Sequence, residues 1–190
     1  MRLIAGLGNP GLAYRRTRHN AGFMAIDRVA QKYGMSISRS KFRTRFSEGN
    51  IGQERVVLIK PWAYMNLSGG PIKDFLDFYH LPIEQLIVIH DDMDMNFGRI
   101  RIKEGGGDGG HKGIRSIIRS MGSGEFCRVK IGIGRPLEAE EAQDYVLHPF
   151  SKTEESLLAD TLSRVVEAIE TILSDGVQQA MNRFNSPARS

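Results

Sequence analysis

Short apolar runs separated by helical segments constrain the fold of this 190-residue chain more than any other feature. Apolar runs occur at residues 56–59 and 86–89, and residues 127–133 also read as a strand. Apolar side chains recur at helical spacing over residues 21–33 and 113–121. Strands interleaved with helices predict an α/β fold, here a single-domain three-layer α/β/α arrangement with a mixed, mostly parallel twisted sheet.

The same patterns predict the remaining elements. Further strands are expected at residues 2–7, 43–51, 54–60 and 99–103, the last with one basic face. Further helices are expected from about Ser68 to Tyr79, over 151–173 and over 176–184. The prediction is one domain spanning residues 1–190, with 185–190 as a frayed tail. No apolar run approaches the length of a membrane span.

Charge is distributed unevenly along the chain. Residues 1–60 carry 12 Lys and Arg against three Asp and Glu, whereas residues 136–190 carry four against ten. A basic N-terminal third is a candidate polyanion-binding surface, although a solvated surface explains the same charges. The single cysteine, Cys127, has no partner for an internal disulfide, which predicts a cytoplasmic protein.

A glycine motif after the first predicted strand suggests a nucleotide cofactor. Gly6, Gly8 and Gly11 match the dinucleotide fingerprint Gly-x-Gly-x-x-Gly. That fingerprint requires a helix to begin at once, and residues 12–19 have no helical apolar face. A nucleotide-cofactor oxidoreductase is therefore kept only as an alternative.

A histidine and an aspartate form the best candidate for acid–base chemistry. His19 precedes the first helix, and Asp91 follows an apolar strand, at the sheet end where α/β proteins place active sites. A carboxylate that orients an imidazole makes it an effective general base. The plainer interpretation of this segment is structural, with Asn20 as the N-cap of the helix. Asp91, Asp92 and Asp94 could instead bind a divalent metal.

Two other segments carry polar groups before predicted helices. Asn66 could donate a hydrogen bond to a carbonyl oxygen, or it could cap the second helix. The glycine run 105–110 could bind phosphate through its backbone N–H groups, or it could be a flexible loop. No nucleophilic serine or cysteine lies in a recognisable elbow, so direct attack by water is favoured over an acyl-enzyme.

Several blocks of the sequence, in order and spacing, resemble one family, the bacterial peptidyl-tRNA hydrolases. The blocks are GLGNPG (6–11), Tyr14, TRHNAG (17–22), YMNLSG (64–69), HDDMD (90–94), GGHKGIRSI (109–117) and RVKIGIG (128–134). The resemblance covers roughly residues 2–184. It implies hydrolysis of the ester between a peptide, or an N-blocked aminoacyl group, and the 3′-terminal ribose of tRNA, which rescues stalled translation products. It also implies a monomer that needs no cofactor and no metal.

The resemblance further implies a role for individual residues. His19 resembles the general base that activates water, oriented by Asp91, and Asn66 resembles the amide that binds substrate and polarises its carbonyl. Asn9 resembles the residue that distinguishes a blocked from a free amine. Positions that contact the substrate or the tRNA correspond to Tyr14, Tyr64, Met65, Lys112, Lys103, Arg128 and Lys130.

The chain departs from the family pattern at three places. The family usually has Asn at the position of Lys112 and often has His at that of Asp108. The run Glu138-Ala139-Glu140-Glu141 stands where relatives can carry basic residues, which suggests that the N-terminal arginines help to bind phosphate. A non-catalytic RNA-binding module is the third alternative, besides the hydrolase and the oxidoreductase.

Overall fold

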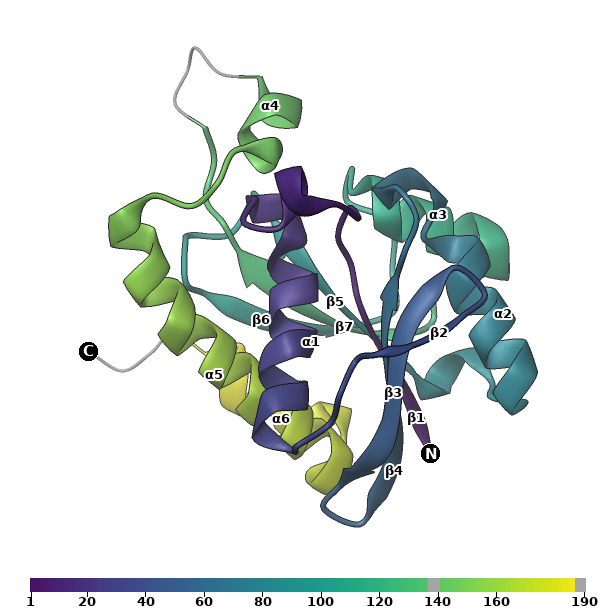
Figure 1. Ribbon diagram of the computed structural model, residues 1–190. Helices are drawn as coiled ribbons and strands as arrows, with labels where there is room; N and C mark the ends of the chain where they lie inside the picture. The colour runs from purple at the N-terminus through teal and green to yellow at the C-terminus, as the bar shows by residue number, and fades with distance from the viewer. Residues whose placement is uncertain (137–140, 187–190) are drawn as a thin grey trace.

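The central strand of the sheet, β1 (Arg2–Gly6), pairs in parallel with β4 (Glu54–Pro61) and with β5 (Leu86–Asp92) in the computed structural model, which describes residues 1–136 and 141–186 (Figure 1). The seven-stranded sheet has the order β2-β3-β4-β1-β5-β7-β6. The outer strands are β2 (Arg39–Lys41), β3 (Thr44–Ile51), β7 (Cys127–Gly132) and β6 (Ile100–Glu104). The strands β4, β1, β5 and β7 are parallel, while β3 and β6 run antiparallel to their neighbours.

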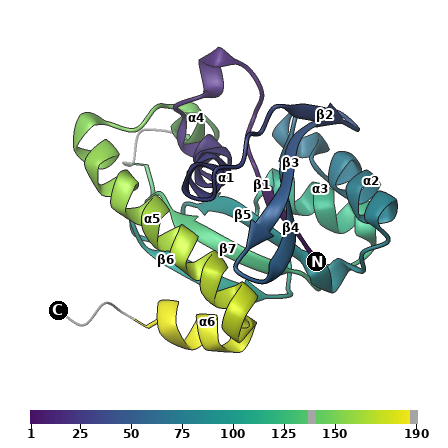
Figure 2. The ribbon, with the colours of Figure 1, turned by 60° about the horizontal axis from the view of Figure 1, so that its bottom comes forward.

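Helices cover both faces of this sheet, as Figures 1 and 2 show. One face carries α1 (Ala21–Lys32), α5 (Lys152–Asp175) and α6 (Val177–Phe184). The other face carries α2 (Gly69–Tyr79) and α3 (Lys112–Met121). The short helix α4 (Ala142–Leu147) and the 3₁₀ turns η1 (Leu12–Tyr14), η2 (Arg18–Asn20), η3 (Met65–Leu67) and η4 (Ile83–Gln85) complete the described elements. The predicted three-layer α/β/α fold is confirmed.

Alternating side chains of the central strands supply two separate hydrophobic cores. In β1, Ile4 packs into the core beneath α1 and α5, while Leu3 and Ala5 pack into the core beneath α2 and α3. In β5, Ile87 and Val88 divide between the two cores in the same way. Because both faces are covered, residues 3–6 of β1 and 86–89 of β5 are apolar or glycine without alternation, which explains the sequence pattern.

The glycines that resemble a dinucleotide fingerprint serve helix packing instead. After β1 the chain passes through η1 and η2, and α1 begins only at Ala21, so no helix N-terminus follows the motif directly. A Cβ at Gly6 would clash with the backbone of Gly22, and one at Gly8 would lie 2.7 Å from the ring of Phe23. The glycines let α1 lie close to β1, but no helix N-terminus faces the motif as a pyrophosphate site requires, so the structure does not support the oxidoreductase alternative.

The sequence patterns missed β2 and α4, which are short. Asn185, the first residue of the tail predicted at 185–190, is held in place, because its side chain accepts a hydrogen bond from Ile102 N (2.7 Å) and donates one to Ile102 O (2.9 Å). Residues 187–190 lie outside the described residues. No helix in the described ranges is long and apolar enough to cross a membrane.

Candidate active site

A cleft of about 1190 Å³ opens at the carboxyl ends of the central strands. This is the end of a parallel sheet at which ligands usually bind. Eight of the predicted site residues line it: Asn9, His19, Tyr64, Met65, Asn66, Asp91, Lys112 and Lys130. Six loops or elements that are far apart in the sequence therefore meet around one cavity.

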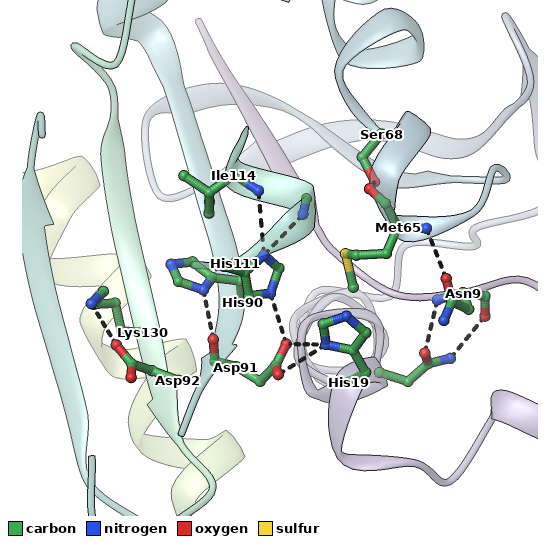
Figure 3. Close-up of polar contacts among 12 residues, drawn as sticks. Asn9, His19, Met65, Ser68, His90, Asp91, Asp92, His111, Ile114 and Lys130 are labelled. Atoms are coloured by element: carbon green, nitrogen blue, oxygen red, sulfur yellow. Dashed lines mark hydrogen bonds and ion pairs between the residues drawn. The ribbon is translucent and has the colours of Figure 1, made fainter. Parts of the chain in front are cut away.

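Asp91 at the end of β5 lies between two histidines (Figure 3). His19 Nδ1 lies 2.9 Å from one carboxylate oxygen and 3.0 Å from the other. Burial opposes ionisation of Asp91, but the charge that His19 can carry and the hydrogen bonds from both imidazoles hold its pKa well below its usual range. An ionised carboxylate only accepts, so His19 Nδ1 carries the hydrogen and Nε2 is left with a lone pair.

The second histidine, His111, was not predicted as a site residue. Its Nε2 lies 3.0 Å from Asp91 Oδ1, while its Nδ1 accepts hydrogen bonds from Gly113 N (3.1 Å) and Ile114 N (3.3 Å). His111 is thus the N-cap of α3, and two backbone donors fix its proton on Nε2. The signal in the sequence that could have indicated this role is the place of His111, directly before a predicted helix, where an N-cap residue stands.

A third histidine, His90, lies behind this pair. Its Nδ1 donates to the Asp91 carbonyl oxygen at 2.7 Å, and its ring packs edge-on against His111 with centroids 4.7 Å apart. Its Nε2 is buried without a hydrogen-bond partner among the described residues. Burial, with a further contribution from nearby His111, holds the pKa of His90 well below its ordinary value. His90 is therefore neutral and supports the backbone of Asp91.

Asn9 is held with one end of its amide facing the cleft. Its Oδ1 accepts from Met65 N at 2.8 Å, so its Nδ2 is the remaining donor. Asn20 holds the backbone of Asn9, accepting from Asn9 N (2.8 Å) and donating to Asn9 O (3.0 Å). Asn20 occupies the N-cap position of α1 but makes no side-chain cap, so the interpretation of its side chain as a cap is wrong.

Asn66 and Tyr64 lie on the opposite wall, beside α2. Asn66 is exposed in η3, and α2 begins three residues later behind Ser68, so the side chain of Asn66 does not cap that helix. Tyr64 is 59% exposed. Met65 is buried, and its Sδ would lie 2.6 Å from a Cβ at Gly113, so a glycine is needed where η3 meets α3.

The metal site proposed for three aspartates does not form. Asp92 pairs with Lys130, Asp94 pairs with Arg135 at 2.7 Å, and Asp91 faces the histidines. Within residues 1–136 and 141–186, one group has metal-like spacing, namely His19, Asp91 and His111, with ligand atoms within 4.8 Å of one another. His111 Nε2 does not suit a metal, because the cap on Nδ1 keeps the hydrogen on Nε2.

Three predicted tRNA contacts do not line the cleft. Tyr14 is half-buried in η1, and Lys103 is exposed on the edge strand β6. Arg128 is only 2% exposed, and its guanidinium donates to the carbonyl oxygens of Gly106, Gly107 and Gly124. The prediction that Arg128 grips phosphate is wrong for this structure, since its donors hold the glycine loop in place.

The departures from the family pattern have local partners. Lys112 Nζ donates to Gln143 Oε1 of α4 at 3.0 Å, which leaves its charge unneutralised. Asp108 accepts from Gly110 N at 2.7 Å and pairs with Arg115 at 3.2 Å, which fixes the glycine loop against α3. Of the acidic segment 138–141, residues 138–140 lie outside the described residues.

Comparison with known proteins agrees with this geometry. The family model described as peptidyl-tRNA hydrolase matches residues 3–190. Peptidyl-tRNA hydrolases of Carboxydothermus hydrogenoformans and Geotalea daltonii are 48% and 46% identical, over 97–98% of both chains in each case. The crystal structure of the Acinetobacter baumannii peptidyl-tRNA hydrolase superposes with a TM-score of 0.92 at 40% identity, covering 98% of this chain and 95% of that one. The chain belongs to the peptidyl-tRNA hydrolase family.

Proposed function

We propose that this chain hydrolyses the ester that joins a peptide, or an N-blocked aminoacyl group, to the 3′-terminal ribose of tRNA. The observation that carries the proposal is the pair formed by His19 and buried Asp91, at 2.9 Å, in the wall of a large cleft. His19 Nδ1 is occupied by Asp91, so its Nε2 is the free base. An activated ester needs little more than a positioned water, such a base and a group that polarises the carbonyl.

The reaction then proceeds by direct attack of water. His19 Nε2 takes a proton from water as the oxygen bonds to the ester carbon, and Asp91 stabilises the imidazolium. Asn66 donates a hydrogen bond to the carbonyl oxygen as it gains negative charge. The bond to the ribose oxygen breaks, the imidazolium returns its proton to that oxygen, and free tRNA and a peptide acid are released.

Asn9 selects substrates whose amine is blocked. Its free Nδ2 can donate to the carbonyl of the blocking group or of the preceding peptide unit. A free aminoacyl group has no such carbonyl and leaves the donor unpaired, which is the kind of mismatch that polar sites reject strongly.

Cations along one side of the cleft bind the tRNA. Lys130 and Lys112 line the cleft, and Lys103 and Arg101 are exposed on the adjacent edge strand β6. Such a row suits the negatively charged phosphates of tRNA. Tyr64, with Met65 packed beside it, and Tyr14 contact the 3′ end of the tRNA.

The activity needs neither a metal nor a cofactor. All groups assigned to the reaction are side chains, and the hydrogen that the helix cap keeps on His111 Nε2 disfavours a metal at Asp91. They also come from one chain, which supports a monomer as the active form. The cytoplasm, where tRNA is charged and used, is the proposed location.

Single-turnover hydrolysis of N-acetyl-aminoacyl-tRNA tests this function. The wild-type protein should release tRNA without added metal or cofactor. His19→Ala should lose roughly 10²–10⁴-fold in rate, because a positioned general base contributes about this much. Asp91→Asn should retain more activity but change the pH profile, because a neutral amide stabilises an imidazolium poorly.

The controls separate catalysis from binding. Both variants should still bind tRNA, as a filter-binding assay measures. If His19→Ala retained activity within a few-fold of wild type, His19 would not be the base. If the wild-type protein bound tRNA without cleaving the ester, it would be an RNA-binding module.

A further inference from the structure

The turn between β2 and β3 has an unusual backbone. Lys41 and Thr44 are paired, so Phe42 and Arg43 form a two-residue hairpin turn. Both have positive φ, 47° and 51°, as in a type I′ turn. Such turns favour Asn-Gly, since a side chain at positive φ costs free energy that glycine does not. Strain of this kind is concentrated at functional sites.

The strained turn brings a cation to the far end of the cleft. Phe42 packs edge-on against buried Phe75 of α2, with ring centroids 5.6 Å apart, which anchors the turn. Arg43 lines the cleft, and its Nη2 lies 3.9 Å from where a Cβ of Gly70 would be. The guanidinium therefore lies over the first turn of α2.

A second cation, Arg119 of α3, lines the same end. The helices α2 and α3 meet closely there, because Gly69 N donates to Ser116 Oγ at 3.0 Å and a Cβ at Gly69 would clash with the Ser116 carbonyl. Neither Arg43 nor Arg119 has an acidic partner among the described residues. The carboxylates that line the other end, Asp92 and Asp94, are both paired.

The sheet order sets the distance of Arg43 from the reacting ester. Arg43 immediately precedes β3, which is separated from β5 and its Asp91 by β4 and β1. Three strand spacings amount to roughly 14 Å, at about 4.8 Å each. An extended peptide covers that distance in about four residues, at roughly 3.3 Å per residue.

We propose that the Arg43 end of the cleft binds the peptide of peptidyl-tRNA and favours acidic side chains about four residues from the ester. This inference rests on the function proposed above. Of the cations assigned to tRNA, Arg101, Lys103 and Lys130 belong to β6 and β7, on the other side of β5 from β3, and Lys112 lies at the start of α3, two turns before Arg119. The two halves of the substrate join at the ester, so the half that leaves toward Arg43 is the peptide. Carboxylates suit Arg43 and Arg119, because a guanidinium donates two parallel hydrogen bonds to a carboxylate.

Matched substrates test the proposal. One tRNA carries a hexapeptide with Glu at the fourth and fifth positions from the ester, and the other carries Gln there. Wild type should have a kcat/KM roughly two- to tenfold higher for the Glu substrate, as expected for a partly exposed charged hydrogen bond. Arg43→Gly should reduce this ratio substantially, and Arg43→Lys should retain most of it.

Stability measurements separate this effect from misfolding. Arg43→Gly removes the strain at positive φ, so its Tm should rise by about 2–4 °C while the preference for Glu falls. Arg45→Gln is the matched control, because Arg45 is an exposed cation two residues away that packs over Trp62 and does not line the cleft. This variant should keep the wild-type preference.

Two outcomes would overturn the proposal. One is a wild-type enzyme that cleaves both hexapeptide substrates equally. The other is an equal loss of kcat/KM by Arg43→Gly on both hexapeptides and on N-acetyl-aminoacyl-tRNA. If the slope of log affinity against log salt concentration also became shallower by about 0.7, Arg43 would contact a tRNA phosphate. Failure of wild type to cleave N-acetyl-aminoacyl-tRNA would instead contradict the proposed hydrolase function.

Discussion

At the scale of single residues, the site depends on which hydrogen bonds are already taken. Asp91 accepts hydrogen bonds from His19 and His111, and Asn9 Oδ1 accepts one from Met65 N. The atoms left over, His19 Nε2 and Asn9 Nδ2, are those that the proposed reaction uses. The supporting bonds thus decide which atom of each side chain faces the substrate.

Two substitutions should separate the two roles of His111. Both His111→Ser and His111→Ala remove the donor to Asp91, so both should lower kcat by a similar factor of tenfold or more. Serine still caps α3, whereas alanine leaves the Gly113 and Ile114 N–H groups unsatisfied. His111→Ala should therefore be less stable than His111→Ser by about 1 kcal/mol. Urea unfolding and single-turnover rates measure the two effects. Wild-type kcat in His111→Ser would mean that the bond to Asp91 does not matter.

At the scale of elements, one buried arginine joins the loop that carries His19 to the C-terminal helices. Arg18 donates to Glu154 of α5 at 2.9 and 3.1 Å and to the Pro149 carbonyl at 2.9 Å. Its guanidinium lies 4.3 Å from the ring centroid of Tyr145 in α4. The position of His19 is therefore coupled to α4, whose residues line the cleft.

Replacing this arginine should affect stability and rate together. Arg18→Lys keeps the charge, but a single ammonium cannot replace Nη2 on Glu154 and Nη1 on the Pro149 carbonyl together, nor stack on Tyr145. We therefore expect a loss of about 1–3 kcal/mol and a lower kcat. Arg16→Lys is the matched control, because Arg16 is exposed and pairs with Glu155 on the same helix. It should change stability by less than about 0.5 kcal/mol. Equal effects of the two substitutions would show that burial of Arg18 adds nothing.

At the scale of the whole molecule, the uneven charge of the sequence is partly neutralised within the fold. The basic N-terminal segment lies against acidic α5, with ion pairs Arg16–Glu155, Arg18–Glu154 and Lys32–Glu170. The polyanion surface expected from residues 1–60 is correspondingly smaller. Arg43, in the same segment, has no acidic partner among the described residues.

The stability of the whole protein should also depend on pH through His90. The pKa of His90 is lowered in the folded state, so the unfolded chain binds an additional proton once the pH falls below about 6.5. The folded state therefore loses stability from this group as the pH falls below that value, at a rate of at most roughly 1.4 kcal/mol per pH unit. Asp91 adds its own loss only below about pH 4, because its folded pKa is lowered below an ordinary value near 3.9.

His90→Asn tests this dependence. The asparagine amide can replace the Nδ1–H donor to the Asp91 carbonyl but does not titrate. The variant should be less stable at pH 7, since it loses the packing against His111, yet its unfolding free energy should fall less between pH 7 and pH 5 than that of wild type. Chemical denaturation at both pH values measures the difference. If the unfolding free energy fell equally in both proteins between pH 7 and pH 5, His90 would not contribute to the pH dependence, since His19 and His111 are present in both.

The sequence alone determined the layers of the fold and the two central members of the site. Apolar runs and helical spacing encode burial locally, and burial on both faces of β1, β4 and β5 is what the pattern records. His19 and Asp91 were recognisable because each stands next to an element boundary in a matching motif. Elements as short as β2 and α4 leave too few residues for a pattern to appear.

Only the tertiary structure decided what the side chains contact. Arg128 matches a family position that contacts phosphate, but it is buried and donates to three glycine carbonyls. Asn20 holds the backbone of Asn9 and does not cap α1. His111 contacts Asp91 only because β5 ends and α3 begins at the same edge of the sheet. Such hydrogen-bond partners lie tens of residues apart, and their pairing depends on strand order and crossover, which no local pattern contains.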